Sequence, residues 1–371
     1  MEGEVAGLRV AFVFREIKKS SNTAYIPFIV DYFKEKGHEV TVFAQGCEFD
    51  LGYVKLPSFG RHVVLRELST AMGSVLKVNR KKFDLIYSRA GTRYVFADIC
   101  SFHFLFGEWG GKGLVPRIFS LSERLSFLIK QKYIISVSNL LKNAIMRNYG
   151  VPEEKIRVIH NGANTEIFNS GNRKTGEARE MRKKYGKGER IALFVGARPE
   201  RKGLPYLLEA MKYVRNCRLV VAGLKAQDGL KFKNAARKLG IEEKVEFLGF
   251  VPHEKLKFLY AASDIFVLPT FFDPCAVSTL EAMASGCVPV DSVFNGSAEL
   301  IENGVNGFKV KEPRNAKEIA GYINLLTEDK NLFRKLQRNA IKTGEGRSFH
   351  VVAKEWEEYF REVCERLGRC P

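Results

Sequence analysis

Residues 8–44 read LRVAFVFREIKKSSNTAYIPFIVDYFKEKGHEVTVFA, and they decide the fold of the first half of the chain. The opening run, 8–14, is short and apolar, as expected for a buried parallel strand, and 24–37 has a helical pattern that ends at Gly37. A second strand-like run follows at 38–44. Strand, helix and strand within about 35 residues form a βαβ unit, which requires a parallel sheet covered by helices.

The same pattern recurs along the rest of the chain. Strand-like runs in the first half continue at 83–88, 133–138 and 156–160, and the polar segment 169–190 predicts a connection with a charged surface helix. A new series of strand-like runs, separated by helical patterns, occupies 190–196, 217–223, 244–250, 264–270 and 287–292. We therefore expect an α/β protein with two doubly wound domains and a ligand site in the cleft between them, at the carboxyl ends of the strands.

The length of 371 residues suits two domains of ordinary size and a terminal element. We place the domains at 1–165 and 166–345 and the terminal element at 346–371. Within that element, 349–368 predicts a long amphipathic helix, whose apolar face consists of Val352, Trp356, Tyr359, Phe360 and Val363. The helix either completes the second domain or packs back on the first.

The formal net charge of +18 favours an anionic partner. Residues 52–150 hold sixteen lysines and arginines against five acids, so most of the excess lies in the second half of the first domain. We expect this segment to dock on anionic lipid or on a phosphorylated acceptor; the alternative is a solvated basic surface without a dedicated partner. A nucleic acid is not expected, because a recognised binding module and interleaved aromatic residues are missing.

The seven cysteines are scattered, without a Cys-x-x-Cys pair, and predict a reduced, intracellular protein without a zinc site. The amino terminus carries early acids and only a short apolar run, which does not predict a signal peptide. No run reaches the ~18 apolar residues that span a bilayer. The expected location is the cytoplasm, and any membrane contact is expected to be peripheral, on the inner face of the cell membrane.

Residues 271–290, FFDPCAVSTLEAMASGCVPV, place one acid before a predicted helix and another inside it. Asp273 precedes the helix, and Glu281 falls in its second turn. A helix start binds phosphate through its free N–H groups and positive dipole, which makes Ala276, Val277, Ser278 and Thr279 candidates. Glu281 can accept ribose hydroxyls there. The plainer interpretation is a helix cap and an ordinary helix residue.

A cationic loop, GARPERKG, follows the strand-like run 190–196. It carries Arg198, Arg201 and Lys202, and a helix is expected to begin at Gly203. Gly196, at the strand end, lies where a backbone can approach a ligand. Paired cations at the carboxyl end of a strand favour binding of a diphosphate; the alternative is a basic surface turn. Gly296, in the turn 292–308, allows either a close backbone approach or a plain turn.

Missing motifs narrow the chemistry further. No two aspartates lie two positions apart, so the Asp-x-Asp metal motif of many sugar-transferring enzymes is lacking, and the patterns Gly-x-Ser-x-Gly and His-Glu-x-x-His are lacking too. The glycines of 107–113, GEWGGKG, do not form a phosphate loop. Metal-independent chemistry on a phosphorylated substrate, without a resident cofactor, is what we expect.

These motifs together resemble the family 4 glycosyltransferases of the two-domain GT-B fold, which include the lipopolysaccharide core glucosyltransferases. The family carries Glu-x7-Glu followed by AMA-x-G-x-PV, and here DPCAVSTLEAMASGCVPV has Asp273 in place of the first Glu. That Asp is a variant of the lipopolysaccharide branch. The resemblance includes VIHNGANTEIF (158–168), the loop around Arg201, the run 246–270 and NGSAELIENGVNGFKV (295–310). It covers most of the chain from Val158 onward.

The resemblance implies two Rossmann-like domains, the first for an acceptor and the second for a nucleotide sugar. It implies retaining transfer from a UDP-, GDP- or ADP-sugar to a hydroxyl of a glycan, a lipid-linked acceptor or a phosphorylated acceptor. By the same comparison Asp273 holds sugar hydroxyls, Glu281 holds the ribose, and Phe250 and Val251 lie near the nucleobase. The helix start at 276–279 neutralises the diphosphate together with Arg201 and Lys202.

Two features of the first domain leave alternatives open. Many relatives have Gly-Gly in the first loop, whereas this chain has FREIKKSSNTAY at 14–25; the candidates to replace it are Lys18, Lys19 or the helix start at Ser20-Ser21-Asn22. His103 falls where relatives place a histidine near the sugar, and it is either catalytic or structural. For the whole chain, a sugar-nucleotide epimerase of the same fold and a basic nucleic-acid-binding protein remain the alternative functions.

Overall fold

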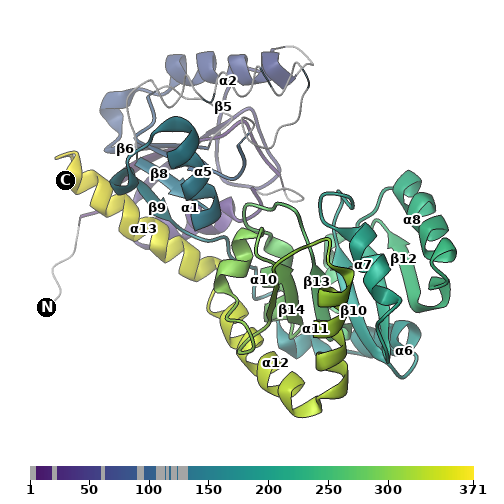
Figure 1. Cartoon of the computed structure of the whole chain (residues 1–371). Coiled ribbons are helices and arrows are strands. Elements are labelled where there is room, and N and C mark those ends of the chain that lie inside the picture. Colours follow the sequence, from purple (N-terminus) through teal and green to yellow (C-terminus); the bar gives the residue numbers. More distant parts are fainter. Residues whose placement is uncertain are drawn as a thin grey trace, which may run out of the picture. The chain divides into compact units, whose positions relative to one another are not determined.

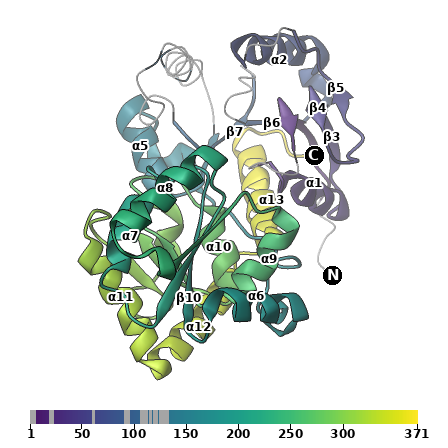
Figure 2. The same cartoon turned by 90° about the vertical axis from the view of Figure 1, so that its right-hand side faces the viewer.

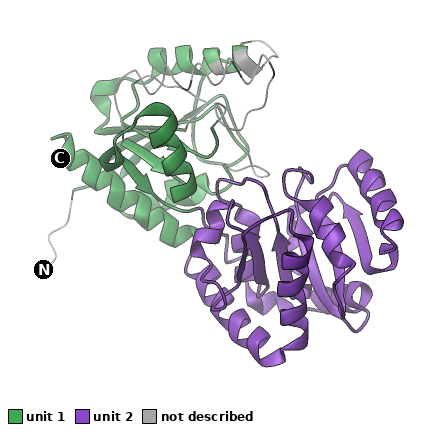
Figure 3. Ribbon diagram, viewed as in Figure 1, with its two compact units in different colours: residues 1–160, 349–371 green, residues 161–348 purple. Residues whose placement is uncertain are grey.

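The computed structural model describes residues 6–18, 23–59, 63–89, 96–105 and 133–371, with the single positions 113, 117 and 123. The chain divides into two compact units, coloured green and purple in Figure 3. Unit 1 comprises residues 1–160 and 349–371, and unit 2 comprises residues 161–348. The boundary precedes the expected position at 165 because the N–H of Ala163 donates to the carbonyl of Arg347 (2.9 Å), which ties this segment to unit 2.

Unit 1 contains a parallel sheet in the order β5-β3-β1-β6-β7-β8-β9. Its strands are β1 (Arg9–Val13), β3 (Glu39–Ala44), β5 (Val54–Lys55), β6 (Leu85–Arg89), β7 (Ile99–Phe102), β8 (Tyr133–Ser136) and β9 (Ile156–Val158). Two short strands, β2 (Glu16–Ile17) and β4 (Gly46–Cys47), pair separately. Figure 1 labels the helices α1 (Ile26–Glu35), α2 (Val63–Lys77) and α5 (Asn139–Tyr149) of this unit, besides the terminal helix described below. The predicted βαβ unit is therefore present as β1, α1 and β3.

The terminal helix α13 (Phe349–Arg366) completes the core of unit 1. It packs against α1, and the five residues of its predicted apolar face are all buried. Aromatic rings make the junction: Trp356 lies 4.9 Å from Tyr87, and Phe360 lies 5.7 Å from Phe12, measured between ring centroids. The sequence left two places open for this helix, and the structure assigns it to the first unit because its apolar stripe covers β1 and β6.

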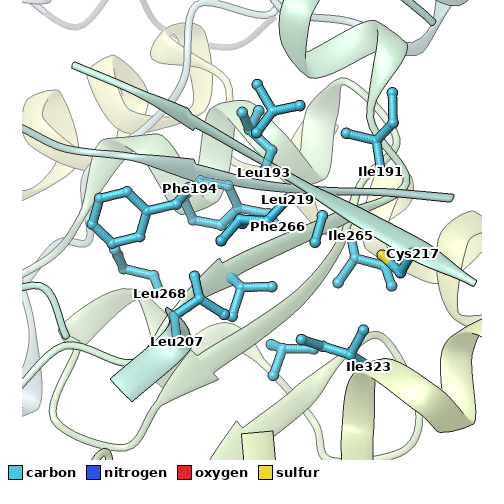
Figure 4. Packing of buried hydrophobic residues seen from close by; sticks show 14 of the residues in the cluster. Ile191, Leu193, Phe194, Leu207, Cys217, Leu219, Ile265, Phe266, Leu268 and Ile323 are labelled. Atoms are coloured by element: carbon cyan, nitrogen blue, oxygen red, sulfur yellow. The ribbon is translucent and has the colours of Figure 1, made fainter. Parts of the chain in front are cut away.

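Unit 2 is a second parallel sheet in the order β12-β11-β10-β13-β14-β15. The strands are β10 (Arg190–Val195), β11 (Cys217–Ala222), β12 (Val245–Gly249), β13 (Ile265–Leu268), β14 (Val288–Ser292) and β15 (Phe308–Val310). In the central pair, β10 and β13, Ala192 is paired with Ile265 and Leu193 with Phe266. Their apolar side chains are buried on both faces of the sheet, as Figure 4 shows for Phe194, Phe266 and Leu268.

Helices cover both faces of this sheet. They are α6 (Gly176–Gly186), α7 (Leu204–Met211), α8 (Ala226–Lys238), α9 (His253–Ala262), α10 (Val277–Ala284), α11 (Ala316–Glu328) and α12 (Lys330–Glu345). α7 packs with α8 and α11, whereas α10 packs with α12 and α9 (Figure 2). Short 3-10 turns are η1 (Arg80–Lys82), η2 (Glu153–Lys155), η3 (Ser170–Lys174), η4 (Glu242–Lys244) and η5 (Gly296–Leu300). None of the described helices combines the length and the apolar composition needed to cross a membrane.

The strand order places a topological switch point between β10 and β13. From β10 the chain proceeds outward through β11 and β12, then returns to the other side of β10 and continues through β14 and β15. In doubly wound sheets, ligands bind at the carboxyl ends of the two strands where the order reverses. The loops that begin at Gly196 and Pro269 are therefore the first place to look for a site in unit 2.

Candidate active site

The loop after β10 carries two cations into the switch point. Gly196 lies directly beneath Lys202: a Cβ atom at position 196 would lie 2.3 Å from Cδ of Lys202. Gly203 begins α7 with φ at +79°, and a Cβ there would lie 2.0 Å from the carbonyl oxygen of Pro269. Position 203 excludes a side chain because the loop is pressed against the end of β13, whereas a methyl group at position 196 would have to displace the flexible stem of Lys202. The glycines thus hold Lys202 and the start of α7 at the switch point.

Asp273, in the loop after β13, lies beside both cations. Its Oδ2 is 3.4 Å from Nη2 of Arg201 and 3.8 Å from Nζ of Lys202. Arg201 also donates through Nη1 to the carbonyl of Phe272, and its Nε is buried without a hydrogen-bond partner among the described residues. The structure therefore brings together the three residues predicted for the sugar and the diphosphate. A diphosphate that engages the two cations would free the carboxylate of Asp273 to accept hydroxyl groups.

The start of α10 offers fewer hydrogen-bond donors to an anion than the sequence indicated. Asn295 reaches across from the loop after β14, and its Oδ1 accepts the N–H of Ala276 (3.0 Å). Thr279 is fully buried; its hydroxyl donates to Asp291 (2.6 Å), and its N–H donates to the carbonyl of Ala276 (3.1 Å). The expectation that Ala276 and Thr279 supply donors to a diphosphate is therefore corrected: their donors are used within the protein.

Val277 and Ser278 are what remains for an anion at this helix start. They occupy the first two positions of α10, where backbone N–H groups have no partner within the helix. The hydroxyl of Ser278 is buried and has no hydrogen-bond partner among the described residues. A buried hydroxyl without a partner is costly, so its presence beside free N–H groups indicates a place for a ligand atom. Gly296, by contrast, forms a structural turn, because its N–H donates to the carbonyl of Asp273 (2.9 Å).

Asp291 holds Thr279 and Asn295 in place through hydrogen bonds. Its carboxylate accepts from the Thr279 hydroxyl, from Nδ2 of Asn295 (2.7 Å) and from the N–H of Ser292 (2.7 Å). Burial raises the pKa of Asp291 to about 7, although all three donors favour the ionised form. Asp291 and Asn295 were missed in the sequence because their roles depend on a contact across twelve or more positions that no local pattern reveals.

The free energy of unfolding should contain a contribution from Asp291 that decreases as the pH rises from about 4 to about 7. In this window the folded protein holds the proton and the unfolded chain has lost it, so a rise in pH favours unfolding. At about 1.4 kcal/mol per pH unit the window is worth up to about 4 kcal/mol. Asp291→Asn lacks this titration. In urea unfolding, the stability of Asp291→Asn relative to the wild type should therefore increase as the pH rises. A difference in stability that does not change with pH would contradict the assignment.

Glu281 is oriented by two residues that sequence reasoning did not assign to the site. Its Oε2 accepts from the hydroxyl of Tyr260 (3.1 Å), and its Oε1 lies 3.4 Å from Nε2 of His253. The hydrogen bond with Glu281 raises the pKa of His253, and burial raises the pKa of Tyr260 well above its ordinary value. His253 and Tyr260 lie seven positions apart on α9 and so share one helix face. Each carboxylate oxygen keeps a lone pair for a ribose hydroxyl.

Phe250 and Val251, the candidates for the nucleobase, follow directly after β12. The ring of Phe250 is 80% exposed, whereas Val251 is partly buried against the core of unit 2. An exposed aromatic ring at the carboxyl end of a strand is available for stacking on a base. These residues and Lys202 both follow the carboxyl ends of strands in the same parallel sheet. The role of Phe250 and Val251 stays a prediction.

His103 lies in unit 1, immediately after β7. Its Nε2 is 3.1 Å from the hydroxyl of Tyr25, another residue that sequence reasoning did not single out. Burial, and the nearby charge of Arg89, lower the pKa of His103 well below its ordinary value, which keeps the ring neutral. Lys18 pairs with Glu16 (3.2 Å). The other candidates of the first loop, 19–22, and most of the glycine segment 107–113 lie outside the described residues.

Gly196→Ala is expected to lower turnover by about tenfold or more with little change in stability. The added methyl group would collide with the flexible stem of Lys202 and displace its ammonium group, and a misplacement of about 1 Å in a catalytic group can cost ~10²-fold. Gly229→Ala, on α8 with open space around it, is the matched control. Steady-state kinetics and thermal unfolding check the pair; equal rates in both variants would show that Lys202 does not depend on Gly196.

Among the described residues no group of three or more His, Cys, Asp or Glu side chains gathers as metal ligands. The acids of the site have protein partners instead. Asp273 faces two cations, and Glu281 faces a tyrosine and a histidine. Arg201 and Lys202 are thus the cations that lie beside Asp273, and they are candidates to meet an anionic ligand together with the start of α10.

Two doubly wound α/β units, the second with cations and a helix start at its switch point, define the GT-B class of protein. Two family models match the chain in series: residues 25–167 match the model described as Glycosyltransferase Family 4, and residues 177–343 match Glycosyl transferases group 1. The chain belongs to this family of glycosyltransferases. Since both descriptions name glycosyl transfer, the epimerase alternative is not favoured.

Curated relatives share part of the chain. An uncharacterised glycosyltransferase of Methanocaldococcus jannaschii is 35% identical over 243 residues, which are 64% of this chain and 61% of that protein. Alpha-D-kanosaminyltransferase of Streptomyces kanamyceticus is 27% identical over 219 residues, 57% of this chain and 55% of that protein. The matched part thus spans little more than half the length of these relatives.

Solved structures share the fold over nearly the whole chain. WaaG, a glycosyltransferase involved in lipopolysaccharide biosynthesis, has a TM-score of 0.75 at 18% identity and covers 93% of this chain and 98% of its own. Anabaena HepE in complex with UDP-glucose has a TM-score of 0.73 at 19% identity, with coverages of 96% and 100%. At these identities the likeness establishes the GT-B fold.

Proposed function

We propose that the chain is a retaining glycosyltransferase that moves a sugar from a nucleotide diphosphate to an acceptor hydroxyl. The observation that carries the proposal is the cluster of Asp273, Arg201 and Lys202 beside the start of α10, at the switch point of unit 2. A related fold, that of HepE, is known in complex with UDP-glucose, which supports a nucleotide sugar as donor. UDP-, GDP- and ADP-sugars all remain candidates.

The chemical reason is the charge that develops on the leaving group. Departure of a diphosphate from an anomeric carbon leaves negative charge on the phosphate oxygens, and fixed cations lower that barrier because they need no reorganisation. Lys202, Arg201 and the free N–H groups of Val277 and Ser278 supply positive charge without a metal. In the retaining reaction the acceptor attacks from the face of the departing phosphate, whose oxygen takes the acceptor proton.

The remaining residues each bind a different part of the donor. Glu281, held by Tyr260 and His253, binds the ribose, and Phe250 with Val251 faces the nucleobase. Asp273 accepts hydroxyls of the transferred sugar once the diphosphate has engaged the cations. Unit 1 binds the acceptor, a glycan, a lipid-linked sugar or a phosphorylated compound, and His103, a neutral imidazole, is the candidate of that unit for a part in catalysis.

A panel assay tests this function. The purified chain is incubated with UDP-, GDP- and ADP-sugars, with and without EDTA, and release of the nucleotide is followed. We expect one donor to be bound and slowly hydrolysed, at a rate that EDTA does not change, and the anomer of the product to match that of the donor. Failure to bind or hydrolyse any donor would contradict the proposal. Conversion of the donor sugar without loss of the nucleotide would instead indicate an epimerase.

A further inference from the structure

Helix α2 of unit 1 has its apolar and polar faces reversed relative to an ordinary surface helix. Leu65, Leu68, Met72, Val75 and Leu76, defined here as the α2 stripe, are all exposed, Leu76 to 81%. Their spacing of three, seven, ten and eleven positions from Leu65 places them on one helix face. None of the five belongs to a buried apolar cluster of the described residues.

The buried side of α2 carries small polar residues: Thr70 and Ser74 lie opposite the α2 stripe, and Ser69 lies beside it. Ser69, Thr70 and Ser74 are at most 2% exposed, and Gln45 donates to the hydroxyl of Ser69 (2.8 Å). At Gly73 a Cβ atom would lie 2.4 Å from Cδ of Pro57, so the helix is pressed closely onto the chain beneath it. The hydrogen bonds and the close packing fix the rotation of the helix about its own axis. The outward position of the α2 stripe is therefore built into the fold.

The stretch of sequence that contains α2 is rich in cations, of which Arg66 pairs with Glu16 and Arg80 pairs with Asp98. Residues 55–82 contain seven lysines and arginines and one acid, Glu67. Lys81 and Lys82, just beyond the end of the helix, are exposed and form no ion pair among the described residues. α2 runs beside β5, the edge strand of its sheet, in both views of the chain (Figure 1, Figure 2). Phe59, also exposed, precedes the helix.

We propose that α2 docks on an anionic membrane surface, with the α2 stripe inserted among the lipid chains and the neighbouring lysines on the headgroups. An amphipathic helix with an apolar stripe and flanking cations is the form that lies in a membrane interface. A second copy of the chain is the poorer occupant, because pairing two stripes would bring together two segments that both carry net positive charge. The proposal is independent of the donor site, which lies in unit 2.

Vesicle flotation of the full chain tests this surface. The vesicles are phosphatidylcholine alone or with phosphatidylglycerol, and each variant is checked by circular dichroism. We expect binding only to the anionic vesicles, weakened by salt. Leu68→Ser with Met72→Ser should bind about tenfold or more weakly, since two apolar side chains no longer enter the membrane. Lys81→Glu with Lys82→Glu should also weaken binding. Leu230→Ser, an exposed leucine on α8, is the matched control and should bind like the wild type.

Other results would overturn the proposal. Absence of binding to anionic vesicles, or equal binding by the wild type and the Leu68→Ser, Met72→Ser variant, would separate the α2 stripe from membranes. Light scattering measures whether the chain forms a dimer. If the wild type is a dimer and this variant is a monomer, the α2 stripe binds a second copy of the chain. Donor turnover in these variants should equal that of the wild type in vesicle-free solution, because α2 carries no residue of the donor site.

Discussion

Lys202→Ala should lower turnover of the nucleotide sugar by ~10²-fold or more, the size of effect seen when a preorganised charge-stabilising group is removed. The ammonium group lies 3.8 Å from Asp273, and its stem packs on Gly196, so its position is set before a ligand binds. The effect should appear in kcat as well as in kcat/KM, because charge on the diphosphate develops in the transition state.

Lys335→Ala provides the matched control for this variant. Lys335 is an exposed lysine on α12 of the same unit, and its loss should leave kinetics and stability unchanged. Thermal unfolding of the Lys202→Ala protein distinguishes a lost charge from a lost fold. Near-normal turnover in a stably folded Lys202→Ala protein would remove Lys202 from the mechanism.

Asp273→Asn should reduce kcat/KM for the donor by about 10²-fold. The substitution keeps the shape of the side chain but removes the charge that faces Arg201 and Lys202 and that accepts hydroxyls of the sugar. Asp273→Glu is the informative partner, because Glu stands at this position in the family 4 motif that the sequence resembles. We expect it to retain activity within about tenfold, since the carboxylate remains.

The donor panel should be repeated on the Asp273→Glu variant. If the length of the acid helps to select the sugar, the preferred donor changes while binding of the nucleotide alone does not. If Asp273→Asn and the wild type prove kinetically equal, the carboxylate has no part in binding the sugar, and the cluster serves only the structure of the loop.

Local patterns predicted most of the fold because buried parallel strands are short, continuous apolar runs. The runs at 8–14, 190–196 and 264–270 became β1, β10 and β13 with their ends shifted by one or two residues. β7 was not predicted: Ile99–Phe102 is only four residues long, and Cys100 and Ser101 interrupt its apolar run. The sequence also did not reveal the reversed faces of α2, because the pattern of a helix gives its period but not the direction it faces.

The candidate site was predictable where one short segment supplies the chemistry. Arg201, Lys202 and Asp273 follow the ends of two strands, and the parallel sheet brings such ends together. Thr279 was misjudged because its partner, Asp291, belongs to another strand, and Ala276 because its cap comes from Asn295. Tyr260 and His253 are ordinary helix residues by pattern. They gain a role only when α9 packs against α10 and meets Glu281.

The most direct test of the central claim is a crystal structure of the chain soaked with the donor that the panel selects. We predict a diphosphate between Lys202, Arg201 and the N–H groups of Val277 and Ser278, with a ribose on Glu281 and the sugar hydroxyls on Asp273. The buried hydroxyl of Ser278 should then have its missing partner, a phosphate oxygen. A donor bound away from the start of α10, or bound there without contact to Glu281 and Lys202, would contradict the account.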